Sequence, residues 1–357
     1  MTHFLPLLQN SFFRILIATC CLCIVGTGHA QPSGILANLS QYAGPDRERV
    51  LLEGAKKEGG LTLYTSIAQK DIPPLISGFE KKYGIKVQVW RAASDKVLQR
   101  TLTETAGKRF EVDAIHVGAP ELEALRLENV LQSVKTPAYS DLLPGAVPAH
   151  REWVATRLTV FVQAFNTQQI KREALPRTWQ DLADPKWKGK LGIELTDDEW
   201  FHDLVQQLGE ERGLKLFRDI VATNGLSVRK GHTLLAQLVA SGEVPMALTV
   251  YSYMAETIKK SGAPIDWFVL DPAITRVNGM GIARQAPHPH AALLFYDYVI
   301  SVEAQKTLAA MDYIPTNALV ESPIKNVKLN ARHTPKTASQ SEKWERLYQQ
   351  TLLPAKN

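Results

Sequence analysis

Hydrophobic residues recur along the chain with two alternating periodicities, one typical of helices and one typical of strands. Amphipathic segments that end at or near a glycine predict three early helices: DRERVLLEGAKKE (46–58), PPLISGFEKKYG (73–84) and SDKVLQRTLTETAGK (94–108). Short apolar or alternating segments predict three strands: LTLYTS (61–66), IKVQVWRA (85–92) and VDAIHV (112–117). This alternation predicts an α/β fold whose parallel sheet is covered by helices on both faces.

A second set of alternating elements follows the apolar segment RLTVFVQAFNT, which begins at Arg157. Its predicted strands are LGIELT (191–196), LSVRKG (226–231) and VPMALTVY (244–251), and its predicted helices cover 200–208, 210–223 and 233–242. Two extended segments are expected within 266–283, then a long helical region over 288–311 and a last amphipathic helix over 341–353. The repeated order of elements predicts a second lobe of the same class.

The first thirty residues differ from the rest, because Arg14 is the only Lys, Arg, Asp or Glu among them. Arg14 precedes the apolar run ILIATCCLCIVG and the small residues TGHA, which together predict a secretory signal peptide cleaved near Ala30. The apolar run has about a dozen residues, fewer than the ~20 that a membrane-spanning helix needs, so a membrane anchor is the weaker alternative. A lipoprotein acylated at Cys20 is another alternative to the cleaved signal peptide.

All three cysteines lie inside this segment, so the mature chain is expected to contain no disulfide and no thiolate metal site. That composition suits export to the periplasm. The formal net charge of the whole chain is +5, without a basic run, which argues against nucleic acid as a partner. With 45% apolar and 22% charged residues, the chain has the composition of a globular protein.

The carboxyl ends of the first three predicted strands carry small or polar residues, and the ligand crevice of a parallel sheet lies beyond such ends. Thr65 and Ser66 end the first strand, Ser94 follows the second, and His116 belongs to the end of the third. We therefore expect these residues at the edge of a binding crevice.

Ser66, Ser94 and Thr233 also stand at or near predicted helix starts, where free backbone N–H groups attract negative charge. Capping of the helix is the alternative role for these hydroxyls. If the three helix starts converge between two lobes, they form an anion site that Arg229 or His232 could reinforce.

Tyr251, Ser252 and Tyr253 interrupt an apolar strand in the segment GEVPMALTVYSYMAE. If the strand continues, its alternation sends both phenols to one side and Ser252 to the other. Either phenol then binds a small ligand or forms an aromatic wall for it, and packing at the end of the strand is the alternative.

The segment TDDEWFHDL follows another strand and contains Asp197, Asp198, Glu199 and Trp200. The acids can complement the positive end of a helix, or they can attract an amine-bearing ligand or a metal. Trp200 is expected to line the ligand from the first turn of the helix. The motif PHPH around Pro289 predicts a solvent-exposed loop and not a metal pair.

No G-x-S-x-G, H-E-x-x-H, P-loop or G-x-G-x-x-G motif occurs in the chain, and the two adjacent aspartates point in different directions from one backbone. The chain is therefore not expected to be an enzyme. A secreted hydrolase or transferase on the same scaffold stays open as an alternative from another class.

The order of the segments resembles that of the extracellular solute-binding proteins of ABC importers, and most of all the ferric-iron-binding subgroup. The most specific segments are DPKWKGKLG and SGEVPMAL. The resemblance covers about residues 50–335 and implies a type II two-lobed periplasmic-binding-protein fold. Two strands, near 158–164 and 272–280, would cross between the lobes. It also implies a monomer that closes on a small solute and delivers it to an ABC permease in the inner membrane, without a cofactor.

These expectations divide the chain into a signal peptide, an N-terminal extension and two lobes. The predicted segments are 1–30 for the signal peptide, 31–59 for the N-terminal extension and helix, 60–158 with about 276–335 for lobe 1, and 159–275 with the C-terminal helix at about 336–357 for lobe 2.

Ferric members of this family hold Fe³⁺ with two adjacent tyrosines, helped in some by a histidine and a glutamate from the first lobe. On this sequence the tyrosine pair falls on Ser252 and Tyr253, the histidine near Ala68 and the glutamate near Gly118. One phenolate supplies much less of the anionic oxygen that Fe³⁺ requires than two do.

The sequence therefore favours an organic anion, or an amine-bearing anion such as a phosphonate-like compound. The residues expected to bind it are Thr65, Ser66, Ser94, Asp198, Trp200, Thr233, Tyr251 and Tyr253. Transported Fe³⁺ is the alternative ligand, and the metal ligands would then be Tyr253, Tyr251 and His116.

Overall fold

The computed structural model describes residues 32–325 and 338–352, so the predicted signal peptide lies outside the described residues. The α-helices are α1 (Pro32–Leu39), α2 (Arg47–Glu58), α3 (Ile72–Tyr83), α4 (Ser94–Ala106), α5 (Ala119–Leu127), α6 (Asp198–Leu208), α7 (Glu210–Asn224), α8 (His232–Ser241), α9 (Ser252–Lys260), α10 (Pro289–Val299), α11 (Val302–Ala310) and α12 (Ala338–Leu352). The strands are β1 (Gly60–Thr65), β2 (Lys86–Arg91), β3 (Ala114–Gly118), β4 (Leu131–Gln132), β5 (Trp153–Asn166), β6 (Leu191–Glu194), β7 (Ser227–Arg229), β8 (Met246–Tyr251), β9 (Ile265–Phe268), β10 (Thr275–Ala283) and β11 (Ile314–Pro315).

The strands form one mixed sheet in the order β2-β1-β3-β10-β5-β8-β6-β7, with β11 and β9 added beside β5 and β4 beside β10. β1 pairs in parallel with β2 and β3, and β6 pairs in parallel with β7 and β8. The predicted α/β class with mostly parallel pairing on each side is thus confirmed. Lobe 1 here means the part of the sheet with β2, β1, β3 and β10, and lobe 2 means the part with β8, β6 and β7. The lobe boundaries expected from the sequence stay a prediction.

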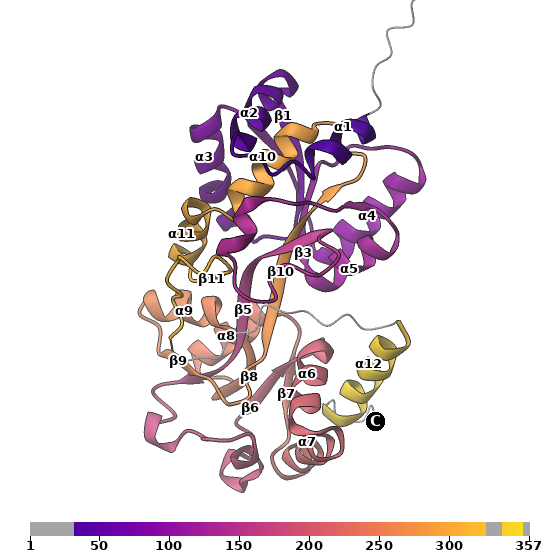
Figure 1. Ribbon diagram of the computed structural model, residues 1–357. Coiled ribbons are helices and arrows are strands. Elements are labelled where there is room, and N and C mark those ends of the chain that lie inside the picture. The colour runs from indigo at the N-terminus through magenta and orange to yellow at the C-terminus, as the bar shows by residue number, and fades with distance from the viewer. Residues whose placement is uncertain (1–31, 326–337, 353–357) are drawn as a thin grey trace, which may run out of the picture. The chain divides into compact units, whose positions relative to one another are not determined.

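The long strand β5 connects the two parts of the sheet, and all 14 of its residues are buried. Its first part, up to Val160, pairs antiparallel with β10, whereas its last part, from Phe161 on, pairs with β8 and β9. Figure 1 shows β5 and β10 running side by side between the helices of the two lobes. Side chains on these two strands therefore lie where the two parts of the sheet meet.

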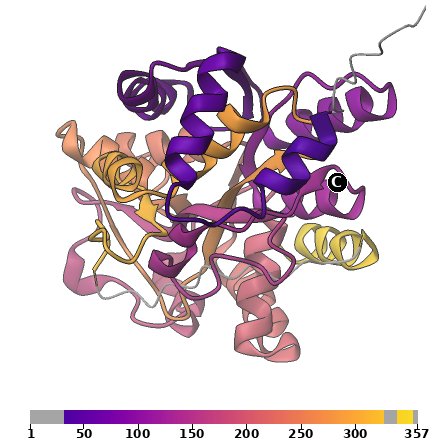
Figure 2. The same cartoon turned by 45° about the horizontal axis from the view of Figure 1, so that its top comes forward.

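Glycines end the first two predicted helices of lobe 1, as the sequence indicates. Gly59 follows α2 with a φ of 82° and Gly84 follows α3 with a φ of 73°, a left-handed conformation that a Cβ atom disfavours. The expected long helical region after PHPH is two helices, α10 and α11, because Ser301 ends the first and caps the second by accepting a hydrogen bond from the N–H of Ala304. α2 packs against α10, which Figure 2 shows as the indigo and orange helices at the front.

The two histidines of PHPH anchor the start of α10, so the prediction of a solvent-exposed loop was wrong. His288 Nδ1 lies 2.9 Å from Asp113 Oδ2, and His290 Nδ1 lies 2.6 Å from Glu58 Oε1. Fully buried Asp113 also accepts hydrogen bonds from the backbone N–H of Thr62 and of His288. One carboxylate thus ties β1 and the N-terminus of α10 to the chain just before β3.

Within the described residues, no helix combines the length and the apolar character that a bilayer span requires.

Replacing Asp113 should destabilise the protein, because the Asp113→Asn change removes a buried anionic acceptor and leaves donors of β1 or α10 without a full partner. We expect a loss of about 3 kcal/mol in the free energy of unfolding, measured by urea denaturation. Asp219→Asn is the control, because Asp219 pairs with Lys215 on an exposed helix face and its loss should change stability by less than ~0.5 kcal/mol. Equal effects of the two changes would contradict the role given to Asp113.

The pKa of His288 is raised above its ordinary value, mainly by its hydrogen bond to Asp113. A pKa that is higher in the folded state contributes stability that is fully present below the ordinary histidine value of about 6.5 and is lost as the pH rises through the folded value. We expect the wild type to lose its stability advantage over His288→Asn as the pH rises above about 6.5 and through the raised folded-state pKa. An advantage that instead grows with pH in parallel denaturation series would be inconsistent with this pair.

Candidate functional site

Four polar residues form a floor between the two lobes. On β5, Arg157 lies opposite Asn278 of β10 and Thr159 lies opposite Arg276. Opposite residues of an antiparallel pair share a face, as do alternate residues along one strand, so these four side chains point to the same side of the sheet. Arg157 is 5% exposed and Thr159 is 4% exposed, although both are polar.

The two guanidinium groups of this floor have few protein partners. Nη2 of Arg157 lies 3.5 Å from Oδ1 of Asn278, and its buried Nε has no hydrogen-bond partner. Nη1 of Arg276 donates to the hydroxyl of Tyr251 over 3.1 Å. Among the described residues, neither guanidinium is within 4.0 Å of a carboxylate oxygen in an ion pair. The floor therefore presents a buried guanidinium, that of Arg157 with its unpaired Nε, and a half-buried one, that of Arg276.

Aromatic rings face the floor from β5, β8, α9 and the segment before β11. The Tyr251 ring lies 4.9 Å from that of Phe161 and stacks on Tyr253 at 6.0 Å, and Tyr253 in turn contacts Tyr313 at 4.7 Å. The guanidinium of Arg157 lies 4.1 Å above the ring of Tyr313. These contacts make an aromatic wall against the charged floor.

The two sequence-predicted phenols share this wall for a reason that alternation did not supply. β8 ends at Tyr251 and α9 begins at Ser252, so the chain turns between the phenols. Burial raises the pKa of both Tyr251 and Tyr253 above the ordinary value of 10.0. Both rings are therefore neutral hydrogen-bonding groups at neutral pH.

Three buried polar atoms around the floor have no hydrogen-bond partner in the protein: Nε of Arg157, Oγ1 of Thr159 and Oε2 of Glu121. Such groups are rare because leaving one unpaired costs about 1–3 kcal/mol. Burial raises the pKa of Glu121, with Arg276 opposing the shift. A polar ligand would satisfy all three atoms.

A cavity of about 540 Å³ opens beside the floor, and it is lined from lobe 1 by Glu121, from β5 by Phe161, from β10 by Arg276, and from α6 by Asp198 and Glu199. The acids outnumber the single guanidinium on this lining. The cavity is therefore suited to a ligand that carries a positive or hydrogen-donating group next to its anionic one.

The backbone of Gly118 shows why Arg276 fits here. A Cβ atom at Gly118 would lie 2.5 Å from Oε2 of Glu121 and 3.5 Å from Nη2 of Arg276. A side chain at this position would thus displace the carboxyl group of Glu121 and contact the guanidinium of Arg276.

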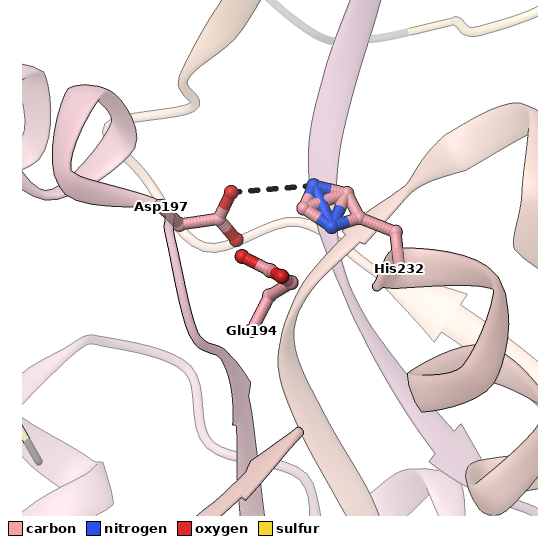
Figure 3. A group of neighbouring side chains, drawn as sticks. All are labelled: Glu194, Asp197 and His232. Atoms are coloured by element: carbon pink, nitrogen blue, oxygen red, sulfur yellow. Dashed lines mark ion pairs between the residues drawn. The ribbon is translucent and has the colours of Figure 1, made fainter. Parts of the chain in front are cut away.

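Behind this cavity, Glu194 at the end of β6, Asp197 before α6 and His232 at the start of α8 point toward one another (Figure 3). Asp197 Oδ1 lies 3.2 Å from His232 Nε2, and one ligand atom from each of the three residues lies within 4.8 Å of the others. Burial raises the pKa of Asp197 well above its ordinary value and lowers that of His232 to about 4. The ring of His232 also contacts that of Tyr251 at 4.2 Å.

The hydroxyl residues predicted at the strand ends are only partly brought together. Ser94 Oγ donates to Ser66 Oγ over 2.9 Å, and Ser94 is the first residue of α4, not its N-cap, which is Ala93. Thr65 is fully buried, and its hydroxyl already bonds the backbone of His116 and Ile67. This placement does not favour a ligand role for Thr65, which stays a prediction.

Thr233 and Trp200 also lie less favourably than the sequence suggests. Thr233 is exposed on α8, and its hydroxyl lies 4.0 Å from the sulfur of Met254. Trp200 is 1% exposed, because its indole packs against Trp179 at 5.7 Å and Phe217 at 5.8 Å in the core of lobe 2. Its edge reaches the cavity wall, and its role there stays a prediction.

His116, an expected ligand in the ferric alternative, is buried inside the sheet. It is 1% exposed, and its Nε2 lies 2.7 Å from the hydroxyl of Thr156. Burial, aided by the charge of Arg157, lowers the pKa of His116 to about 3, so the ring is neutral.

Sequence reasoning missed the residues of the floor. Arg157 and Arg276 lie in segments that read as buried strands, RLTVFVQAFNT and TRVNGMGIA. A charged residue inside a buried strand is the signal that could have found them, because such residues are rarely buried without a partner.

Three comparisons place this geometry among known proteins. The sequence profile of the family described as bacterial extracellular solute-binding protein matches residues 75–331. Iron uptake protein A1 of Synechocystis sp. is 25% identical over 305 residues, which are 78% of this chain and 82% of that protein.

Two solved structures share the fold. Iron-bound HitA from Pseudomonas aeruginosa superposes with a TM-score of 0.69 at 22% identity, covering 80% of this chain and 98% of that chain. AfuA from Actinobacillus pleuropneumoniae with bound fructose-6-phosphate superposes with a TM-score of 0.65 at 21% identity, covering 83% of this chain and 99% of that chain. These matches confirm the predicted two-lobed type II binding-protein fold.

Substitution of two threonines of β5 tests whether the polar groups of the floor are left for a ligand. Thr156 and Thr159 are both buried, but only the hydroxyl of Thr156 has partners, at His116 and the backbone of Asn278. We expect Thr156→Val to lower the free energy of unfolding by about 1–3 kcal/mol, and Thr159→Val, which removes an unpaired buried hydroxyl, not to lower it without ligand. Chemical denaturation of both variants measures the difference. A large loss in Thr159→Val would show that its hydroxyl has a structural partner.

Proposed function

The chain belongs to the family of bacterial extracellular solute-binding proteins, and we propose that its solute is a small organic anion held between the two lobes. Members of this family deliver a solute to an ABC permease and are not enzymes. The observation that carries the proposal is the pairing of buried Arg157, whose Nε has no hydrogen-bond partner, with half-buried Arg276 on one face of the crossing strands.

The chemistry of this pair selects the anion. A guanidinium presents planar donors that match the oxygens of a carboxylate, phosphate or phosphonate, and such charge-assisted hydrogen bonds are about twice as strong as neutral ones. The hydroxyl of Thr159 lies on the floor, and that of Tyr253 lies on the aromatic wall that faces the floor. A bound oxyanion can reach both hydroxyls. An anionic group would therefore find donors on two sides.

The cavity beside the floor supports the finer proposal of an amine-bearing anion. Glu121, Asp198 and Glu199 line it together with Arg276. An ammonium group near these acids, with the anionic group at the arginines, gives a dipolar ligand whose two ends match the two regions of charge. Aminoalkylphosphonates and amino acids have this form.

Fe³⁺ is the second candidate, because relatives such as iron uptake protein A1 are named for iron and three phenols, Tyr251, Tyr253 and Tyr313, lie together. Two features oppose it. Burial raises the pKa of each phenol, which disfavours the phenolate that Fe³⁺ needs, and the floor adds two positive charges. The organic anion is therefore the first proposal.

The place of action is part of the proposal. We expect an exported, monomeric protein in the periplasm that binds no nucleic acid, in line with the predicted signal peptide and with relatives such as the Fe(3+)-binding periplasmic protein of Serratia marcescens.

Solute-induced thermal shifts of the mature protein test this function, because a ligand that binds only the folded state raises its melting temperature. The panel pairs an aminoalkylphosphonate with its amine-free analogue, and adds a sugar phosphate, a dicarboxylate and a ferric salt. We expect an organic anion to stabilise the wild type, and Arg157→Gln and Arg276→Gln each to lower its affinity at least about tenfold. Arg284→Gln is the control, because Arg284 binds backbone carbonyls outside the floor.

Iron would give a different pattern. If a ferric salt alone stabilises the protein and produces a visible tyrosinate band that Tyr253→Phe abolishes but Arg157→Gln does not, the organic-anion proposal is wrong. A panel in which no anion shifts the wild type would also count against it.

A further inference from the structure

We propose that Glu194, Asp197 and His232 form a binding site for a divalent transition-metal cation of the Zn²⁺ type, behind the solute cavity. The site is separate from the arginine floor and from the phenols of the ferric alternative. It does not depend on the identity of the solute.

The three side chains come from three different elements and converge on one point, as Figure 3 shows. Glu194 is 3% exposed, Asp197 is 5% exposed, and the side chain of His232 is 10% exposed. Burying two acids and an imidazole together is unfavourable unless they are paired or coordinate a metal. The fold nonetheless brings one ligand atom of each to within 4.8 Å of the others.

Two atoms in the cluster have no hydrogen bond. Oδ2 of Asp197 and Nε2 of His232 are both buried and without a hydrogen-bond partner, although Nε2 lies 3.2 Å from Oδ1 of Asp197. A metal bound tetrahedrally through nitrogen and oxygen at about 2.0–2.2 Å holds its ligand atoms ~3.3 Å apart. The 3.2 Å between Nε2 of His232 and Oδ1 of Asp197 is close to this separation.

The third residue is fixed by its own hydrogen bonds. Oε1 of Glu194 accepts from the N–H of Gly231, and Oε2 accepts from the N–H and the hydroxyl of Thr196. A carboxylate has about four acceptor positions, so one remains on Oε1 for a cation. Hydrogen bonds of this outer kind orient ligands in known metal sites.

The residues around the cluster are mostly acidic, and the cluster is accessible from the solute cavity. The sequence ELTDDE places four acids between 194 and 199, and Arg276 is the only nearby cation among those that act on the pKa of His232. Asp197 lines the 540 Å³ cavity, so an ion can arrive from that side. One imidazole and two carboxylates with an open fourth position are a ligand set that Zn²⁺ accepts.

Neighbouring aromatic rings fix the orientation of the His232 ring, as a metal ligand requires. It lies 4.2 Å from the ring of Tyr251 and 5.9 Å from that of Phe161, so both aromatic residues limit its rotation. A bound ion would in turn fix the position of Tyr251, which lies next to the arginine floor.

Zn²⁺ titration of the EDTA-treated mature protein, followed by isothermal calorimetry and melting temperature, tests the proposal. We expect one equivalent to bind and to raise the melting temperature. Removing an outer-shell partner usually lowers metal affinity about 10–100-fold, so His232→Gln and Asp197→Asn, which remove ligands, should each lower it by at least ~100-fold.

A matched control lies on the same lobe. His202 Nδ1 pairs with Asp203 Oδ1 at 2.6 Å, and within the described residues this pair belongs to no group of three metal-ligating side chains, so His202→Gln should leave Zn²⁺ affinity unchanged. Tyr253→Phe should also leave it unchanged, which separates this site from the phenols.

Co²⁺ gives a second readout that does not depend on stability. Tetrahedral coordination by His232 and the carboxylates should produce visible d–d absorption that His232→Gln removes and His202→Gln retains. The proposal is overturned if the wild type binds no equivalent of Zn²⁺, or if His232→Gln and His202→Gln bind it equally. If Asp197→Asn does not fold, the two histidine variants still decide.

Discussion

The pairing of β5 with β10 determines where the crevice lies and what it contains. β10 belongs to lobe 1, and β5 connects it to lobe 2. Because β5 is buried along its whole length, any polar side chain on it must find a partner or a ligand. The register between Arg157 and Asn278 and between Thr159 and Arg276 collects the polar residues on one face. The opposite face of β5 packs in the core, which makes the floor rigid.

Charge in the crevice is separated into two regions. The arginines lie on the floor under a wall of neutral phenols, while acids gather at the N-terminus of α6 and around the cavity. In a site of low dielectric this separation produces a strong local field, which favours a ligand with a matching dipole over one with a single charge. Because these acids attract positive charge, a cation site can lie next to the anion site.

The comparisons and the crevice agree on the fold and differ on the ligand. The two lobes and the crossing strands match iron-bound and sugar-phosphate-bound structures alike. At the positions that the resemblance assigns to metal ligands, this chain has Ser252 and Gly118, and the space next to Gly118 is filled by Glu121 and Arg276. A guanidinium near the expected metal position repels a cation and attracts an anion, so binding chemistry can change while the scaffold stays.

The sequence by itself determined the elements, because their signals are local. Hydrophobic period, glycines such as Gly59 and Gly84, and the segment DPKWKGKLG predicted the helices, the strands and the two-lobed fold. It also placed Tyr251 and Tyr253 at the crevice, since both end or follow a strand. It could not show that α9 begins between them, because strand and helix signals overlap there.

Only the tertiary structure decided the chemistry of the site. Arg157 meets Arg276, and Glu194 meets His232, through pairings between segments that are far apart along the chain. The hydrophobic periodicity of a segment does not predict such a contact between distant residues, because the contact depends on sheet register and on the packing of helices from both sets of elements. For the same reason the sequence, which predicts that Trp200 lines a ligand, did not indicate that its indole packs against Trp179 and Phe217 in the core of lobe 2, where burial of apolar area stabilises the fold.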